Sequence, residues 1–273
     1  FLPAFLQTAK GDYQASVAQA DFQTAAVAAR GEINHWVAQK TRNRIQDILP
    51  DGSVNTLTRL VLANAIYFKG TWARRFDKSA TSTAPFDLAP GRKVQVPMMR
   101  QKGDVRYTEN ADFQAVELPY IGGGLSMVIL LPNQADGCGQ LERHLTPALL
   151  ASTLKQMRER EVEIFLPRFK LESSFKLNDT LASMGMTAAF GTQADFSGMD
   201  GTKDLFISGV FHKAWGEVNE EGTEAAAATA VVMEMKALAQ SPVFLADHPF
   251  IFFIRDTRSG SVLFLGRLAD PSH

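Results

Sequence analysis

The sequence predicts an α+β fold in which large, mostly antiparallel β-sheets are flanked by helices. Near the start, residues 1–13 and 24–41 carry apolar side chains at the three- and four-residue spacing of amphipathic helices. The middle of the chain alternates apolar and polar residues with period two, as in 161–167, which is typical of half-buried strands. Strongly apolar strands are predicted over 250–255 and 261–267. A strand-rich chain whose helices lie mainly in its N-terminal part is typical of an α+β domain.

The first elements follow from this spacing. In the first helix we expect one set of residues to face inward: Leu2, Phe5, Leu6 and Ala9. In the second helix the corresponding set is Ala25, Ala28, Ile33, Trp36 and Val37. Between them, 16–21 alternates and predicts a short strand. Residues 59–68 form a nearly continuous apolar run, which predicts a strand buried on both faces.

The later elements are predicted in the same way. The strands expected in the middle of the chain are 94–100, 105–110, 113–119 and 126–132. Helices are expected over 141–144, 147–157 and 175–184, the last ended by Gly185. Two further strands, 205–210 and 211–218, precede the apolar pair that closes the chain.

Composition narrows the function classes. The chain has 273 residues, of which 45% are hydrophobic and 21% charged, an ordinary balance for a globular protein with a sizeable core. A net charge of −1 gives no electrostatic reason to expect nucleic acid or a membrane as a partner. Cys138 is the only cysteine, so an internal disulfide is impossible. The chain shows no signal-peptide pattern at its start.

Motifs for catalysis or cofactors are weak. The five histidines show no metal-ligand spacing, and no Gly-x-Ser-x-Gly motif is present in the sequence. We therefore expect no metal, no cofactor and no enzyme activity. His212 lies in an apolar strand, where a buried histidine with satisfied hydrogen bonds is one interpretation.

The segment 217–249 is long, rich in alanine and short of turn signals. As a strand it would place small side chains on one face, namely Thr223, Ala225, Ala227, Thr229 and Val231. As a helix it is equally acceptable, because alanine is the best helix former. A long connection of this kind is usually functional or disordered, and a surface loop with an alanine bias is the plainer interpretation.

This segment resembles the hinge of a serpin reactive-centre loop. The resemblance rests on Asn219-Glu220-Glu221-Gly222-Thr223-Glu224-Ala225-Ala226-Ala227-Ala228-Thr229. Other stretches are similar to serpin motifs in the same order and spacing: 62–72, 96–99, 246–250, 252–255 and 263–267. Because these motifs are long and cover essentially the whole chain, the sequence is identified as a member of the serpin family.

The resemblance implies a single serpin domain over 1–273 that lacks the N-terminal part of the fold, with a reactive-centre loop at about 219–246. It also implies a suicide inhibitor of serine proteases that is a monomer, with loop–sheet polymers as a second state. An extracellular or periplasmic location is favoured by the resemblance. A non-inhibitory serpin that acts as a binding or carrier module, or as a protease substrate, is the alternative.

Several residues acquire roles only through the resemblance. Asn64 and His212 match the pair that hydrogen-bonds where the main sheet opens, and Trp215 matches the tryptophan where the loop enters that sheet. Glu220 matches the hinge glutamate, and Arg168 the basic residue that pairs with it.

The resemblance also implies the position of the bait bond, which is the peptide bond that the target protease attacks. The family's scissile residue is the seventeenth counted from the hinge glutamate, which gives Lys236–Ala237 here. A lysine fits the anionic pocket of trypsin-like proteases. A shift by one residue would give Met235, which suits chymotrypsin- or elastase-like pockets. After cleavage the loop would insert into the sheet, and small residues at Thr223, Ala225 and Ala227 would permit their burial.

Overall fold

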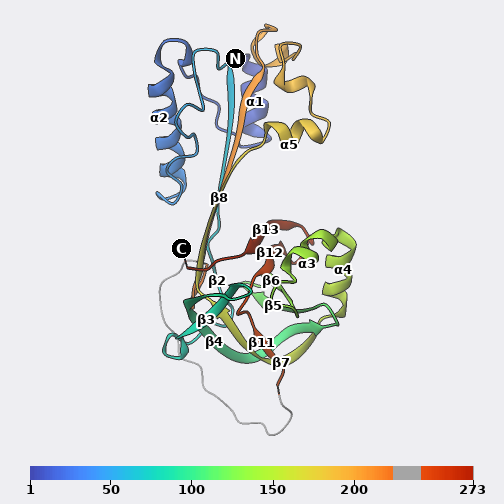
Figure 1. Ribbon diagram of the computed structural model, residues 1–273. Coiled ribbons are helices and arrows are strands. Elements are labelled where there is room, and N and C mark those ends of the chain that lie inside the picture. Colours follow the sequence, from blue (N-terminus) through green and yellow to red (C-terminus); the bar gives the residue numbers. More distant parts are fainter. Residues whose placement is uncertain (224–240, 273) are drawn as a thin grey trace. The chain divides into compact units, whose positions relative to one another are not determined.

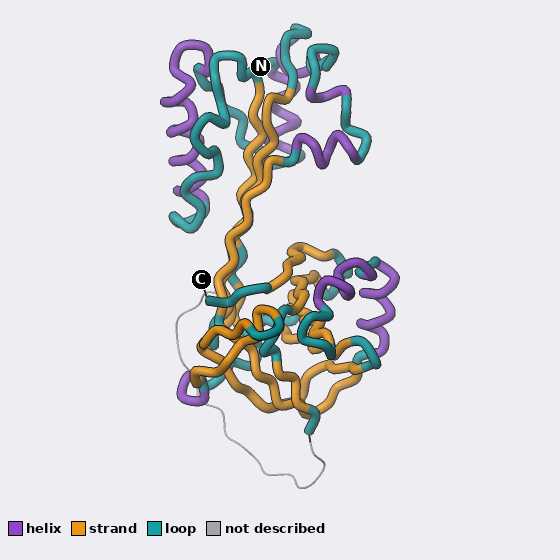
Figure 2. The backbone as a smooth tube through the Cα atoms, viewed as in Figure 1, coloured by secondary structure: helices purple, strands orange, loops and turns teal. Residues whose placement is uncertain are grey.

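The computed structural model describes residues 1–223 and 241–272, and these residues group into two compact units (Figure 1). The first consists of Phe1–Tyr67 and Glu172–Trp215, and the second of Phe68–Leu171 and Gly216–His273. Helices and sheet strands occur together in the chain (Figure 2), so the predicted α+β class is confirmed. In the part of the chain that the structure describes, no helix is long and apolar enough to cross a membrane.

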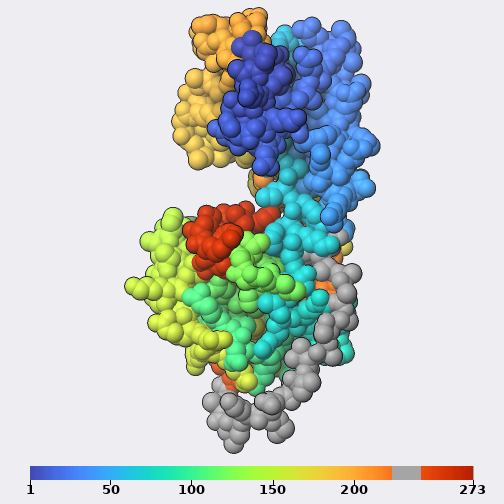
Figure 3. All heavy atoms as spheres, turned by 180° about the vertical axis from the view of Figure 1, so that it is seen from behind, coloured from blue at the N-terminus to red at the C-terminus, as the bar shows by residue number. Residues whose placement is uncertain are grey.

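Helices of the first unit are α1 (Pro3–Gly11), α2 (Phe22–Lys40), α5 (Asn178–Ser183) and α6 (Ser197–Asp200), with a 3-10 helix η2 (Ala188–Phe190). Helix α2 begins where the Asp21 carboxylate accepts a hydrogen bond from Thr24 N at 2.9 Å, which satisfies a free donor of the first turn. Leu2 N donates to Met199 O at 2.7 Å and ties the start of α1 to α6. Figure 3 shows α1 in dark blue on the surface of this unit.

Both N-terminal helices are confirmed, but some expected details are wrong. Residues 16–21 form no strand, and they pair with no other described segment. In α1 only Ala9 is buried, while Leu2 and Leu6 are exposed. In α2 the helical spacing is interrupted at Ala25, and the buried residues are Ala29, Asn34 and Val37.

A three-stranded sheet has the order β1-β9-β8, with β1 (Leu60–Tyr67), β9 (Ile207–Val218) and β8 (Phe169–Lys176). Strands β1 and β9 run parallel, and Asn64 lies opposite His212 in the register. Strand β9 is continuous where the sequence predicts two strands. It ends at Val218, directly before the segment that resembles the hinge of a reactive-centre loop.

Two other expectations about these strands are wrong. The helix predicted over 175–184 is shorter, because the alternating pattern of β8 continues through Phe175 and α5 begins only at Asn178. The strand predicted to be buried on both faces is half-buried. One face of β1 packs on a core through residues such as Val61 and Ala63, but Leu62 on the other face is 43% exposed.

The core of the first unit joins α2, the segment after it, and β9. Its buried members are Val37, Ile45, Ile48, Leu49, Val54, Phe211 and Trp215. Asn34 fixes the segment after α2, because its side-chain amide donates to Leu49 O at 3.0 Å and its Oδ1 accepts from Leu49 N at 2.9 Å. Both polar ends of this buried side chain are therefore satisfied.

The second unit is built on an eight-stranded sheet with the order β11-β7-β4-β5-β6-β12-β13, and β3 pairs with β4. The strands are β3 (Ser82–Ala89), β4 (Arg92–Glu109), β5 (Phe113–Pro119), β6 (Leu125–Pro132), β7 (Arg158–Pro167), β11 (Val243–Leu245), β12 (Phe250–Asp256) and β13 (Val262–Leu268). The two strands predicted over 94–110 are a single strand, because the ladder with β7 continues through Gly103.

Helices α3 (Cys138–His144) and α4 (Pro147–Gln156) lie on one side of this sheet (Figure 2). They pack on residues such as Phe113 and Ile251, and Cys138 is buried there as a free thiol whose pKa is raised by burial. A larger apolar core in the same unit contains Trp72, Tyr107 and Phe244. Three short elements complete the unit: β2 (Gly70–Thr71), η1 (Lys78–Ala80) and β10 (Gly222–Thr223).

Candidate functional site at the end of strand β9

The four residues after β9 form a closed turn. Asn219 N donates to Gly222 O at 2.9 Å, and Gly222 N donates to Asn219 O at 3.2 Å. Inside the turn, Glu221 N donates to Asn219 Oδ1 at 3.0 Å. Strand β10 then pairs antiparallel with β2, with Gly222 opposite Thr71. The chain therefore reverses direction directly before residue 224. We call residues 219–222 the hinge turn.

Gly222 occupies a place that no other residue fits. Its φ is 139°, a conformation that residues with a side chain rarely adopt. A Cβ at this position would lie 2.1 Å from Gly70 O and 2.7 Å from Thr71 Cα, which are backbone atoms that cannot move aside. The glycine thus allows close approach of the hinge turn to β2.

Glu220 is the buried charge of the hinge turn, with only 2% of the residue exposed. Arg168 Nε lies 2.7 Å and 2.8 Å from its two carboxylate oxygens, and Thr81 Oγ1 donates to Oε1 at 2.5 Å. Burial by itself raises the pKa of Glu220, but the hydrogen bonds from Arg168 and Thr81 outweigh it, and the pKa lies below its usual value. Phe76 N donates to Glu220 O at 3.0 Å and holds the backbone as well.

Trp72 contacts the hinge turn, a role that the sequence does not predict. Its indole Nε1 donates to Asn219 O at 2.9 Å, and its backbone N donates to Glu221 O at 3.0 Å. The buried ring stacks on Tyr120 with a centroid distance of 4.6 Å. The stretch 62–72 is similar to a serpin motif, but nothing in the sequence distinguishes this tryptophan as a partner of residue 219.

Trp215, which the resemblance places where the loop enters the sheet, makes its ring contacts with other residues. The ring packs on Tyr67 at 5.6 Å, and the Arg44 guanidinium lies 4.7 Å from its centroid. Trp215 belongs to the core of the first unit. The indole that hydrogen-bonds to the hinge turn is that of Trp72, and a role for Trp215 in loop entry stays a prediction.

Asn64 and His212 come together in the first unit. The His212 Nδ1 donates to Asn64 Oδ1 at 2.8 Å, and this bond bridges the parallel strands β1 and β9. Phe175 stacks on the imidazole at 6.2 Å. His212 is half-buried instead of fully enclosed. The bond is therefore a side-chain link between two strands that are also joined by backbone hydrogen bonds.

The other expected site residues lie outside the described residues. These are Glu224, Ala225, Ala226, Ala227, Ala228, Thr229, Met235, Lys236 and Ala237. For Thr223 the structure describes the backbone alone. The roles that the resemblance gives to all of these residues stay predictions.

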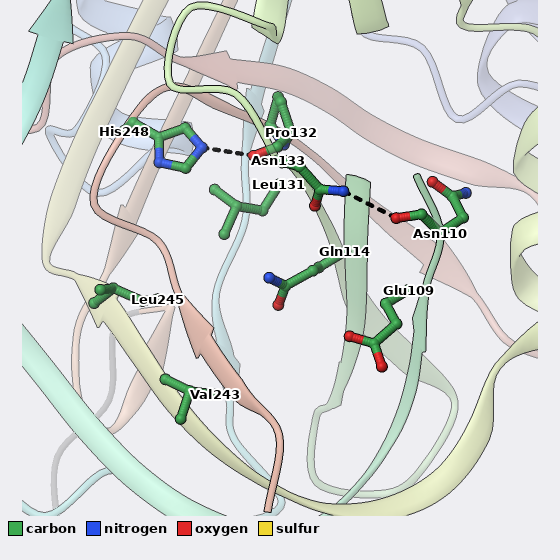
Figure 4. A pocket seen from close by; sticks show the side chains of 9 residues that line it. All are labelled: Glu109, Asn110, Gln114, Leu131, Pro132, Asn133, Val243, Leu245 and His248. Atoms are coloured by element: carbon green, nitrogen blue, oxygen red, sulfur yellow. Dashed lines mark hydrogen bonds between the residues drawn. The ribbon is translucent and has the colours of Figure 1, made fainter. Parts of the chain in front are cut away.

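A separate pocket of about 360 Å³ lies beside β11 (Figure 4). Val243 and Leu245 line one side, and Gln114 and Glu109 the other. At its end, His248 Nε2 donates to Pro132 O at 2.7 Å. Tyr107 already donates to Glu109 at 2.9 Å. Within residues 1–223 and 241–272, no group of three or more His, Cys, Asp or Glu side chains could hold a metal ion.

Comparisons with known proteins agree with the motifs. A family model described as "Serpin (serine protease inhibitor)" matches residues 1–271. The leukocyte elastase inhibitor of Sus scrofa is 47% identical over 279 residues, which cover 99% of this chain and 74% of that protein. Uncleaved ovalbumin superimposes with a TM-score of 0.89 at 34% identity, covering 99% of this chain and 73% of ovalbumin. A thyroxine-binding globulin complex with thyroxine gives a TM-score of 0.90 at 29% identity, and the match covers 100% of this chain and 72% of the globulin chain.

Proposed function

We propose that this chain, which belongs to the serpin family of serine protease inhibitors, traps trypsin-like serine proteases. The bond at which it would trap them is Lys236–Ala237. The observation that carries the proposal is the position of Glu220. Glu220 is paired with Arg168, as the resemblance implies for the hinge glutamate, and the family's count of the loop starts at that glutamate. The seventeenth residue in that count is Lys236.

The proposed reaction starts with attack of the protease serine on the Lys236 carbonyl, which forms an acyl-enzyme and releases the amine of Ala237. The freed segment that begins at Thr223 then inserts between β1 and β9, the parallel pair that Asn64 and His212 bridge. New ladder hydrogen bonds and buried small side chains drive insertion, so the uncleaved protein is kinetically trapped. The attached protease is displaced before it can complete hydrolysis.

A second target class is favoured by one observation. The relative from Sus scrofa is named for inhibition of leukocyte elastase. Met235 directly precedes Lys236, and cleavage after Met235 would suit an elastase- or chymotrypsin-like pocket. The two targets are distinguished by the first residue of the released peptide, which is Ala237 for trypsin-like cleavage and Lys236 for the alternative.

The test is to incubate the protein with trypsin and, separately, with leukocyte elastase. Each mixture is then run on a denaturing gel, and the released peptide is sequenced. A band at the summed mass that survives denaturation is expected with trypsin, and the variant Lys236→Ala should lose it. Cleavage of the wild type by both proteases without such a band would contradict inhibition. That outcome would favour a carrier or a simple substrate, and thyroxine-binding globulin is a structural neighbour whose name records ligand binding.

A further inference from the structure

The residue directly after Glu220 has an ion pair of its own. Lys78 Nζ lies 2.5 Å from Glu221 Oε1, although 143 positions separate the two residues. Lys78 begins η1, in the connection between β2 and β3. The Glu221 side chain is 13% exposed and that of Lys78 is 65% exposed. The pair thus joins a nearly buried carboxylate to an ammonium that solvent can reach.

Glu221 is the less satisfied of the two hinge glutamates. Both carboxylate oxygens of Glu220 accept hydrogen bonds. The Oε2 of Glu221 is buried and has no hydrogen-bond partner among the described side chains and backbone. A buried acceptor without a partner destabilises the state that buries it. The side chain of Glu221 therefore favours leaving the hinge turn, and Lys78 is the group that opposes its release.

The hinge turn cannot open while Glu221 stays in place. Trp72 N donates to the carbonyl of Glu221, and the amide of Glu221 donates to Asn219 Oδ1, each at 3.0 Å. Gly222, the next residue, sits against the backbone of Gly70. Release of Glu221 breaks both backbone contacts at once, and the segment from Thr223 onward is then free to change its direction.

We propose that the ion pair between Lys78 and Glu221 is a latch that delays opening of the hinge turn and so slows insertion of the cleaved loop. The inference rests on the proposed function, because it takes insertion as the step after cleavage. Lys78 is a positioning residue that acts through Glu221. Since the ammonium is largely in solvent, the latch is weak enough to open when the loop is cut and is sensitive to salt.

Opening is measured on the uncleaved protein by hydrogen exchange with mass spectrometry. The amide hydrogens of Trp72 and Phe76 report it, because both donate to hinge carbonyls. In Lys78→Gln we expect their exchange to be faster by about two- to fivefold, because the Lys78 ammonium is largely in solvent and the pair is correspondingly weak. About 1 M salt should bring the wild type close to the variant. Lys78→Arg should keep exchange slow, and adding Glu221→Gln to Lys78→Gln should slow exchange again, because it removes the unpaired buried charge.

The matched control is Lys93→Gln, which removes a comparable exposed ion pair, Lys93–Asp87 at 3.0 Å, between β3 and β4. Unchanged exchange in Lys78→Gln, or an equal increase in Lys93→Gln, would overturn the latch. The effect of the ion pair on insertion is measured as the moles of protein consumed per mole of trypsin inhibited. Because faster insertion leaves less time for hydrolysis, this ratio should fall in Lys78→Gln. Faster exchange with no fall in the ratio would overturn that effect on insertion. Absence of any covalent complex in the wild type would instead count against the proposed function, and the exchange result would still decide the latch.

Discussion

Arg168 Nε lies 2.7 Å from one carboxylate oxygen of Glu220 and 2.8 Å from the other, and this contact fixes the point at which the chain leaves β9. Arg168 lies between β7 and β8, 52 positions before Glu220. The contact therefore ties the hinge turn to the sheet of the second unit. Every residue of the turn up to Gly222 is then held by at least one hydrogen bond or close contact, to Trp72, Thr81, Lys78 or β2.

Arg168→Ala should lower the free energy of unfolding by about 2 kcal/mol. This value lies between the figures for exposed and buried pairs, because Glu220 is buried while Arg168 is partly exposed. Urea unfolding followed by circular dichroism measures the change. Lys170→Ala removes a looser ion pair nearby, Lys170–Glu217 at 3.8 Å, and should cost less than about 0.5 kcal/mol. Equal losses in the two variants would show that the Glu220 contact has no special weight.

Gly222→Ala should destabilise the hinge turn, since the new Cβ would fall 2.1 Å from Gly70 O and the φ of 139° is unfavourable for alanine. Overpacking of this kind costs about 1–3 kcal/mol. Gly216→Ala in β9 is the matched control, because a Cβ there meets nothing within 4 Å. The thermal midpoint of both variants gives the comparison. A midpoint for Gly222→Ala that equals the control would contradict the close approach of the turn to β2.

The pairs Asn64–His212 and Arg168–Glu220 can be named from the sequence because their residues match positions of the serpin family. Trp72 cannot be singled out, because its partner is a backbone carbonyl 147 positions away, which leaves no trace in a side-chain pattern. The same holds for Lys78, whose ion pair with Glu221 depends on how η1 is placed. Long-range contacts of this kind follow from the folded chain and not from local residue preference.

Local patterns predict most strands but not their ends. The helix expected to begin at Phe175 is wrong there because Phe169, Leu171, Ser173 and Phe175 alternate, a period-two pattern that continues the strand. The sequence also predicts a break after residue 210, yet the ladder of β9 with β1 runs without interruption from Val61 to Tyr67. Pairing with a neighbour thus decides strand length where the sequence alone offers several break points.

The stability of the protein should fall as the pH rises through neutrality because of His248. Its two ring nitrogens face acceptors, Pro132 O at 2.7 Å and Asp247 Oδ1 at 2.8 Å, so both are satisfied only when the ring is protonated. Burial lowers the pKa of His248, but hydrogen bonds to Asp247 and Pro132 and the charges of Asp247 and Asp87 outweigh it and raise the pKa.

A histidine whose pKa is raised in the folded state stabilises the fold fully at pH values below its pKa in the unfolded chain, about 6.5. This stabilisation is lost as the pH rises through the pKa of the folded state. Urea unfolding at a series of pH values from about 5.5 to 8.5 should show this fall in the wild type. His248→Gln should flatten the slope in this range, because it removes the titrating ring between Pro132 and Asp247. A slope that His248→Gln does not alter would refute the assignment.

Thr223→Arg should turn the inhibitor into a substrate. Thr223 is the first residue after the hinge turn, and on the proposed mechanism its side chain is the first to enter the sheet between β1 and β9. Burying an unpaired guanidinium there would slow insertion, because a charge taken out of water without a partner is strongly disfavoured. Hydrolysis of the acyl-enzyme would then finish first and release active protease. The measurement is the ratio of covalent complex to cleaved protein on a denaturing gel after reaction with trypsin. Thr223→Ser serves as the control and should keep the complex. If Thr223→Arg forms as much complex as the wild type, trapping does not depend on insertion at this position, and the mechanism proposed for this chain is wrong.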